Sequence, residues 1–137
     1  MNNSDWVYVA IVFSANKELK SQQLSNILYL FRNLITPKYL PKHFYNDWKA
    51  SLDGPCSEEL RKDVQKLLKN EELLSHESKL TIRDIDVHKK AIDIIEHLPI
   101  GTKSYMHLIV SWVISGSHHT LIRSMTIRMK ELKEAKV

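Results

Sequence analysis

The seven histidines of this 137-residue chain are the side chains best suited to bind a metal or transfer protons. His118 and His119 are adjacent, and neighbours on a helix point about 100° apart, so they cannot form a facing pair. His88, His97 and His107 are expected on separate elements, and none has a second histidine four residues away. The chain contains neither H-E-x-x-H nor C-x-x-C. We therefore predict structural histidines and no metal site.

The remaining candidates for catalysis are a cysteine and two glutamates. Cys56 precedes an expected helix, where the helix dipole lowers the pKa of a thiol, but no partner base can be chosen for it. Glu58 and Glu59 are neighbours and face different directions on a helix, so they cannot work as an acid/base pair. Three glycines leave no room for a glycine-rich phosphate loop. We therefore expect a non-enzymatic protein without a cofactor.

Positive charge is concentrated in two places. The whole chain carries a formal +4, and residues 117–137 hold five basic and two acidic residues. A second group lies on one side of an expected helix over residues 57–70. It consists of four basic residues and one glutamine: Arg61, Lys62, Gln65, Lys66 and Lys69. Such surfaces attract nucleic acid or acidic proteins, and they also occur as ordinary solvated faces. The sequence leaves both interpretations open.

Composition indicates a single ordered domain over residues 1–137. Apolar residues make up 43% of the chain and charged residues of both signs 26%, which is typical of globular proteins. The longest apolar runs, residues 6–13 and 108–114, are shorter than the roughly 18 residues that span a bilayer. No basic segment precedes the first run, which predicts the absence of a secretory signal. We expect a soluble cytoplasmic protein.

Two helices are predicted before residue 37. Residues 6–13 can follow a cap at Asn3 or Ser4, although their β-branched side chains leave a strand open. A clearer helix begins at Ser21 and ends before Pro37. Its apolar residues recur at helical spacing, and they are Leu24, Ile27, Leu28, Phe31 and Leu34. The polar residues on its other faces are Gln22, Gln23, Asn26 and Arg32.

Residues 35–55 are irregular and rich in aromatic side chains. They include Pro37 and Pro41 and the aromatic residues Tyr39, Phe44, Tyr45 and Trp48. Aromatic side chains in a loop can cover the core, or they can form a surface that binds a partner protein. The sequence alone does not separate these two roles.

A third helix and a hairpin are predicted next. Gly54 and Pro55 are expected to turn into the helix, with Pro55 in its first turn, and the helix to end near Asn70. Its apolar stripe is Leu60, Val64, Leu67 and Leu68. Residues 73–74 and 79–82 then form two short extended pieces around a polar four-residue turn at 75–78.

Three further helices are expected after the hairpin. The first begins at Asp84, with Val87, Ala91, Ile94, Ile95 and Leu98 inward. The second begins at Thr102 after a break and holds Tyr105, Leu108, Ile109 and Trp112. The last follows Gly116 and holds Leu121, Ile122, Met125, Met129 and Leu132. These closing helices could pair two copies of the chain, through Trp112, Ile114, Leu121, Ile122 and Met125, or wrap back over the first helix.

This order of elements predicts a mostly helical α+β fold of the winged-helix type. The winged-helix-like core covers about residues 5–98, and residues 102–137 form a helical extension. The helix over residues 57–70 takes the recognition position, and residues 73–82 form the wing.

Three short motifs carry a resemblance to known proteins. Residues 21–31 (SQQLSNILYLF) resemble the "L-x-K-L-L-Y/F-L" helix of a loose group of small microbial winged-helix proteins. Residues 54–60 (GPCSEEL) resemble the "G-P-Y-S-E-E-L" motif of that group, and residues 79–81 (KLT) its "Y-x-L-T-x-x-G" strand. The Panacea-type antitoxin domain of phages and other mobile elements is similar in the first two motifs. The resemblance extends over about residues 22–95.

Two functions follow. The resemblance implies a regulatory module of a mobile element (an antitoxin, adaptor or anti-defence factor) that binds an unidentified protein, for which the contact candidates are Tyr39, Phe44, Tyr45 and Trp48. Met125 and Met129 are further candidates for exposed contacts. The alternative is a DNA-binding regulator that uses Arg61, Lys62, Gln65, Lys66 and Lys69 of the third helix and Lys79 of the wing. Glu58 and Glu59 would repel phosphate at the start of that helix.

Overall fold

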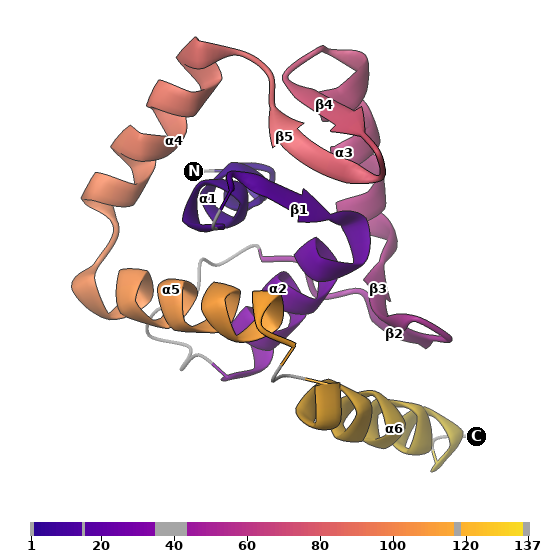
Figure 1. Ribbon diagram of the computed structural model, residues 1–137. Helices are drawn as coiled ribbons and strands as arrows, with labels where there is room; N and C mark the ends of the chain where they lie inside the picture. The colour runs from indigo at the N-terminus through magenta and orange to yellow at the C-terminus, as the bar shows by residue number, and fades with distance from the viewer. Residues whose placement is uncertain (1, 15, 35–43, 117–118, 136–137) are drawn as a thin grey trace.

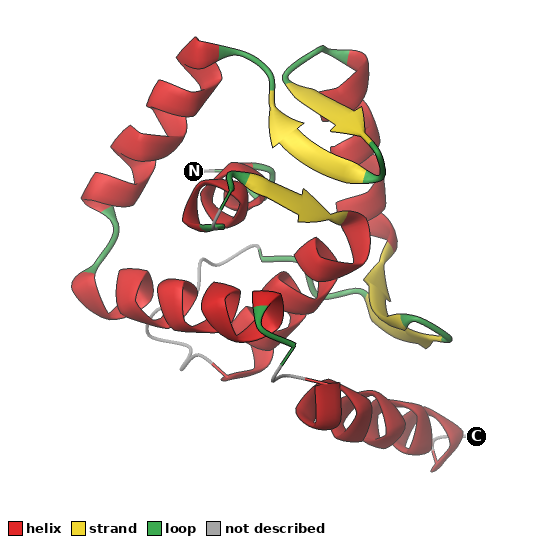
Figure 2. Cartoon of the chain, viewed as in Figure 1, coloured by secondary structure: helices red, strands yellow, loops and turns green. Residues whose placement is uncertain are grey.

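The computed structural model describes residues 2–14, 16–34, 44–116 and 119–135. Helices dominate and the strands are short, so the fold is mostly helical α+β, as predicted (Figures 1 and 2). The elements in chain order are α1 (Asp5–Phe13), β1 (Glu18–Lys20), α2 (Ser21–Leu34), β2 (Trp48–Ser51), β3 (Gly54–Ser57), α3 (Glu58–Lys69), β4 (Leu73–His76), β5 (Lys79–Ile82), α4 (Ile85–His97), α5 (Ile100–Ile114) and α6 (His119–Ala135).

Helix α1 lies at the centre of the molecule. Figure 1 shows it between α4, α5 and the strands β1 and β5, and it contacts all four elements as well as α2. Every residue from Asp5 to Ile11 is buried. A helix that is apolar on all sides is stable only when other elements surround it, which explains why residues 6–13 form a helix despite their weak periodicity. The Ser4 side chain makes no capping hydrogen bond.

Helix α2 begins at Ser21, as predicted, and buries Leu24, Ile27, Leu28 and Phe31. Two expectations for its faces were wrong: Leu34 is 42% exposed, and Asn26 is only 7% exposed. Asn26 tolerates burial because its Oδ1 accepts a hydrogen bond of 2.9 Å from Gln22 Nε2. Gln22 Nε2 also donates to the backbone oxygen of Pro55, so this polar pair ties α2 to β3.

A three-stranded antiparallel sheet has the order β1-β5-β4. The hairpin β4–β5 was predicted, but its turn is only two residues long. Glu77 and Ser78 both have positive φ, 51° and 65°, as in the tight turns that match strand twist. Strand β1 was missed, because three residues are too few to show alternation. It pairs with β5 through Leu19 opposite Leu80, and both side chains are buried.

A second hairpin, β2–β3, occupies part of the segment expected to be irregular. Pro55 lies in β3 and not in the first turn of a helix, so that prediction was wrong. Gly54 has φ +131°, a conformation open mainly to glycine, and a Cβ atom there would lie 2.9 Å from Gln22 Nε2. Strand β3 then ends at Ser57, which caps α3, and the helix begins at Glu58, three residues after Pro55.

The remaining helices match the sequence in most respects. Helix α3 ends at Lys69, and α4 starts after Asp84, whose side chain accepts the N–H of Asp86 at 2.8 Å. Helix α5 begins at Ile100, ahead of Thr102, and packs on α1 and α2, so it wraps back over the body. Helix α5 holds the four apolar residues expected in it, of which Tyr105 is 43% and Leu108 59% exposed. Helix α6 packs on β2 and β3.

Candidate functional site

The aromatic residues predicted to contact a partner divide into buried and surface positions. Phe44 and Tyr45 are 5% and 0% exposed, and the Phe44 ring centre lies 5.7 Å from that of Trp6. They anchor residues 44–47 to the core, so the expectation that they form a binding surface is corrected. Tyr39 lies outside the described residues. Trp48 is half-buried, and its indole N–H donates to the Tyr45 backbone oxygen at 2.8 Å.

Tyr45 also attaches this segment to α3. Its hydroxyl donates to Asp63 Oδ2 at 2.5 Å. Burial, followed by that hydrogen bond and the Asp63 charge, raises the pKa of the Tyr45 phenol far above its ordinary value. The phenol therefore remains neutral and keeps donating at any physiological pH.

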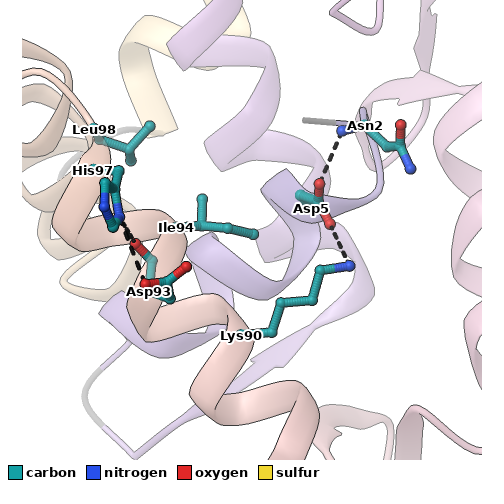
Figure 3. Close-up of a pocket in the computed structure, with 7 residues that line it drawn as sticks. All are labelled: Asn2, Asp5, Lys90, Asp93, Ile94, His97 and Leu98. Carbon is teal, nitrogen blue, oxygen red and sulfur yellow. Dashed lines mark hydrogen bonds and ion pairs between the residues drawn. The ribbon is translucent and has the colours of Figure 1, made fainter.

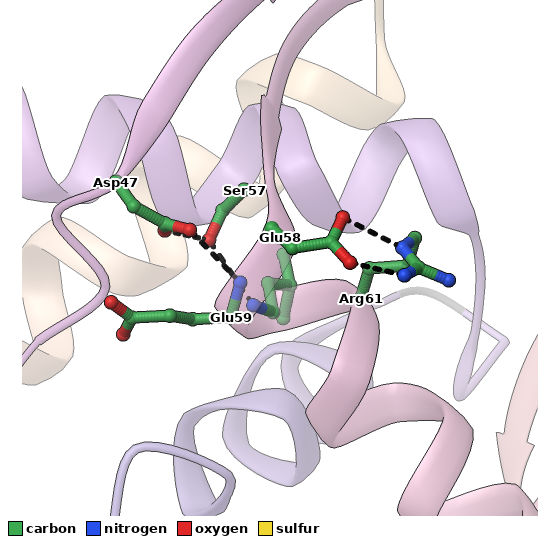
Figure 4. Close-up of polar contacts among 6 residues, drawn as sticks. Asp47, Ser57, Glu58, Glu59 and Arg61 are labelled. Carbon is green, nitrogen blue, oxygen red and sulfur yellow. Dashed lines mark hydrogen bonds and ion pairs between the residues drawn. The ribbon is translucent and has the colours of Figure 1, made fainter.

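Asp47 continues the attachment at the start of α3 (Figure 4). The Ser57 hydroxyl donates to Asp47 Oδ1, and the Glu59 backbone N–H donates to Asp47 Oδ2 at 3.0 Å. Ser57 Oγ in turn accepts the Leu60 N–H at 3.1 Å. Side chains of the protein thus accept hydrogen bonds from backbone N–H groups that could otherwise bind an anion at the start of the helix.

A groove of about 1320 Å³ lies between the β2–β3 hairpin and α6. We call it the hairpin groove. Leu52, at the turn of the hairpin, is fully exposed, and Ile127 on α6 is 49% exposed. The apolar residues that line the groove are Trp48, Ala50, Leu52, Ile122, Ile127 and Met129. Of the two methionines expected at the surface, Met125 and Met129 are both half-buried, and Met129 lines this groove.

Three cations line the same groove. Lys49 comes from β2, whereas Arg123 and Lys130 come from α6. Arg123 and Lys130 are seven residues apart, so they lie on one side of the helix, about 10.5 Å apart along its axis. Within the described part of the chain, none of the three makes an ion pair. Two acidic residues line the groove too: Asp47, whose carboxyl oxygens both accept hydrogen bonds at the start of α3, and Asp53, which is exposed at the hairpin turn.

The residues predicted to contact DNA are only partly available. Arg61 pairs with Glu58 through its Nε, 2.8 Å from Oε2, and this bond lowers the pKa of Glu58 (Figure 4). Lys79 Nζ lies 3.1 Å from Glu18 Oε1. The remaining candidates are exposed on α3, and these are Lys62, Gln65, Lys66 and Lys69.

The three lysines of that group form a stripe along α3. Lys62, Lys66 and Lys69 follow at spacings of four and three, which places them on one side of the helix. Among the described residues, no carboxylate forms an ion pair with any of them. The sequence therefore identified this stripe correctly, but not the pairing of Arg61 and Lys79.

A smaller pocket of about 470 Å³ lies between the start of α1 and α4 (Figure 3). Asp5 accepts the Asn2 backbone N–H at 2.8 Å, and its other oxygen lies 3.6 Å from Lys90 Nζ. His97 Nδ1 lies 2.8 Å from the Asp93 backbone oxygen, and this hydrogen bond, with the Asp93 charge, raises the His97 pKa. These polar groups satisfy one another, so the pocket offers little to a ligand.

The other residues considered for catalysis lie apart. His88 and His97 share α4, contrary to the expectation that they occupy separate elements. Cys56 is exposed on β3, where it pairs across the hairpin with Lys49. In the parts of the chain that the structure describes, no three His, Cys, Asp or Glu side chains are grouped to hold a metal ion.

Comparison of the chain with protein-family models, with curated proteins and with solved structures gave no match in any of the three. No helix among the described residues combines the length and the apolar character needed to cross a membrane. Function is therefore inferred from the hairpin groove and from α3.

Proposed function

We propose that this protein is a non-enzymatic, protein-binding regulatory module on a winged-helix scaffold, and that the hairpin groove is its binding site. The observation that carries the proposal is the groove itself, where exposed apolar side chains such as Leu52 and Ile127 lie beside unpaired cations. An apolar patch with a polar rim is typical of protein interfaces. The order α1-β1-α2-α3-β4-β5, with the β2–β3 hairpin inserted between α2 and α3, and the β1-β5-β4 sheet support the winged-helix assignment.

One residue of the GPCSEEL motif, on which the family resemblance partly rests, lines this groove. Residues 54–60 form β3 and the first residues of α3, and Gly54 lines the groove. The resemblance to the Panacea-type antitoxin domain supports a role in a mobile element. There the module would act as an antitoxin, an adaptor or an anti-defence factor by occupying a surface of its partner protein.

A photo-crosslinking amino acid at Leu52 tests the site in cells of the source organism. We expect a crosslink to one partner protein, because Leu52 projects from the hairpin turn with its side chain fully exposed. The matched control is the same amino acid at Ile85, an apolar residue of α4 that is 69% exposed. Equal crosslinking from both positions, or a crosslink from Leu52 to nucleic acid alone, would contradict the proposal.

DNA binding is the second candidate function, and the lysine stripe of α3 is the observation in its favour. Phosphate contacts require such unpaired cations. A winged-helix protein, however, presents the start of its recognition helix to the major groove. Here that end carries Glu58, Glu59 and the capping carboxylate of Asp47, which places negative charge where phosphate would approach.

Charge reversal on the stripe separates the two functions. We expect the wild type to bind random duplex DNA weakly, and K62E/K66E to reduce that binding no more than K20E/K89E does. K20E/K89E is the control, because it changes the net charge by the same amount at exposed sites on β1 and α4. The measurement is duplex affinity at low and high salt. Tight binding that falls steeply with salt and is lost only in K62E/K66E would establish the DNA-binding function instead.

A further inference from the structure

We infer that the hairpin groove takes an acidic, amphipathic segment of the partner protein, with apolar side chains on the groove floor and carboxylates against Lys49, Arg123 and Lys130. This inference rests on the proposed function and adds the chemistry of the partner. The size, the lining and the charge of the groove each support it.

The size of the groove favours a polypeptide segment over a small molecule. Sites for small molecules enclose about 300–1000 Å³, whereas this groove measures about 1320 Å³. Trp48, Ile122 and Met129 are partly or fully buried and form its apolar floor, while Leu52 and Ile127 project at its edges. An apolar floor of this kind suits the apolar face of a helix or strand. It offers much less to the phosphates of nucleic acid.

The charge of the groove selects an acidic segment. Lys49, Arg123 and Lys130 are exposed and have no ion-pair partner among the described residues. Two carboxylates also line the groove, Asp47 and Asp53, so the three cations leave it a formal charge of +1. The Asp47 oxygens already accept hydrogen bonds from Ser57 and Glu59. Arginine binds carboxylates through two parallel hydrogen bonds, which adds orientation to attraction.

The spacing of the cations sets the spacing of the partner's acids. Arg123 and Lys130 are separated by about 10.5 Å along α6. Two carboxylates seven residues apart lie on one side of a helix and are separated by about the same distance, whereas residues three apart on a strand point to opposite faces. We therefore expect the partner segment to be a helix that carries acidic residues seven positions apart, with apolar residues between them.

Selection from a displayed library of random peptides, each about four helical turns long, tests this inference on the full chain. We expect selected peptides to combine apolar residues with Asp or Glu at the spacing given above. Their affinity for R123E/K130E should fall at least about tenfold, and the loss should shrink at high salt, where charges are screened. Peptides in which Lys replaces Asp and Glu should bind R123E/K130E better than they bind the wild type.

The matched control is K89E/R128E, which changes the net charge equally at exposed residues that do not line the groove. Circular dichroism of each variant checks that the fold is intact. The inference fails if no peptide is selected, if the peptides show no acidic bias, if both variants lose affinity equally, or if single-stranded nucleic acid displaces the peptides. A protein crosslink from Leu52 would then still support the proposed function, so the two failures are distinguishable.

Discussion

Replacement of Tyr45 by alanine is expected to lower the free energy of unfolding by about 3–5 kcal/mol. The side chain is 0% exposed, and its ring centre lies 5.7 Å from that of Phe44. Truncation would leave a cavity in the core and remove the hydrogen-bond donor of Asp63. Urea unfolding followed by far-ultraviolet circular dichroism measures the loss.

Tyr45→Phe is the control, because it keeps the ring and removes only the hydroxyl. We expect it to cost about 1–3 kcal/mol, the penalty for a partly buried carboxylate that loses its donor. A Y45A variant within about 1 kcal/mol of the wild type would show that residues 44–47 are not anchored as described. Because Asp47 and Trp48 follow directly in the chain, loss of this anchor should also weaken peptide binding in the hairpin groove.

Stability is expected to fall at alkaline pH, and two buried tyrosines account for most of the loss. Burial, joined by Glu72 for Tyr8 and by Asp63 for Tyr45, raises both phenol pKa values well above 10.0. Above pH 10 the unfolded chain therefore releases two protons that the folded protein retains, which favours unfolding. The free energy of unfolding should drop by about 1.4 kcal/mol per pH unit for each tyrosine. Below pH 10 their contribution is fully present.

Unfolding measured from about one pH unit below to one unit above 10.0 tests this slope. Tyr45→Phe should remove one of the two contributions and leave a shallower decline. A curve that stays flat through this range, or a slope that Y45F does not alter, would refute the burial of these phenols. Tyr29 is also buried and its pKa is raised by a smaller amount, so it adds a lesser third contribution that Y29F should remove.

Helices with one apolar stripe and a clear cap could be predicted from the sequence. Helix α3 begins after Ser57 and α4 after Asp84, and each presents apolar residues at helical spacing. Strands β1 and β2 could not, because β1 has only three residues and all of β2 after Trp48 is exposed, so neither shows an alternating pattern. Pro55 was misleading for a physical reason: it suits a first helical turn, yet the Gly54 conformation and the bond from Gln22 hold it in a hairpin.

The hairpin groove could be predicted only in fragments. The sequence shows that Tyr45 and Trp48 are both aromatic. Only the fold shows that Tyr45 is fully buried as an anchor, whereas Trp48 is half-buried and reaches the surface. Lys49 and Arg123 are far apart in the sequence, and no local pattern shows that α6 packs on β2 and β3. The excess of positive charge in residues 117–137 and the two methionines Met125 and Met129 were the indications that α6 contributes to a binding surface.

The double use of Asp47 constrains how this protein can evolve toward a new partner. Its carboxylate lines the hairpin groove and also holds the start of α3 through Ser57 and Glu59. A substitution there that improved a contact would loosen the helix at the same time. Leu52 and Arg123 carry no such second role among the described contacts, so adaptation to altered partners should proceed through those positions while Asp47 stays fixed.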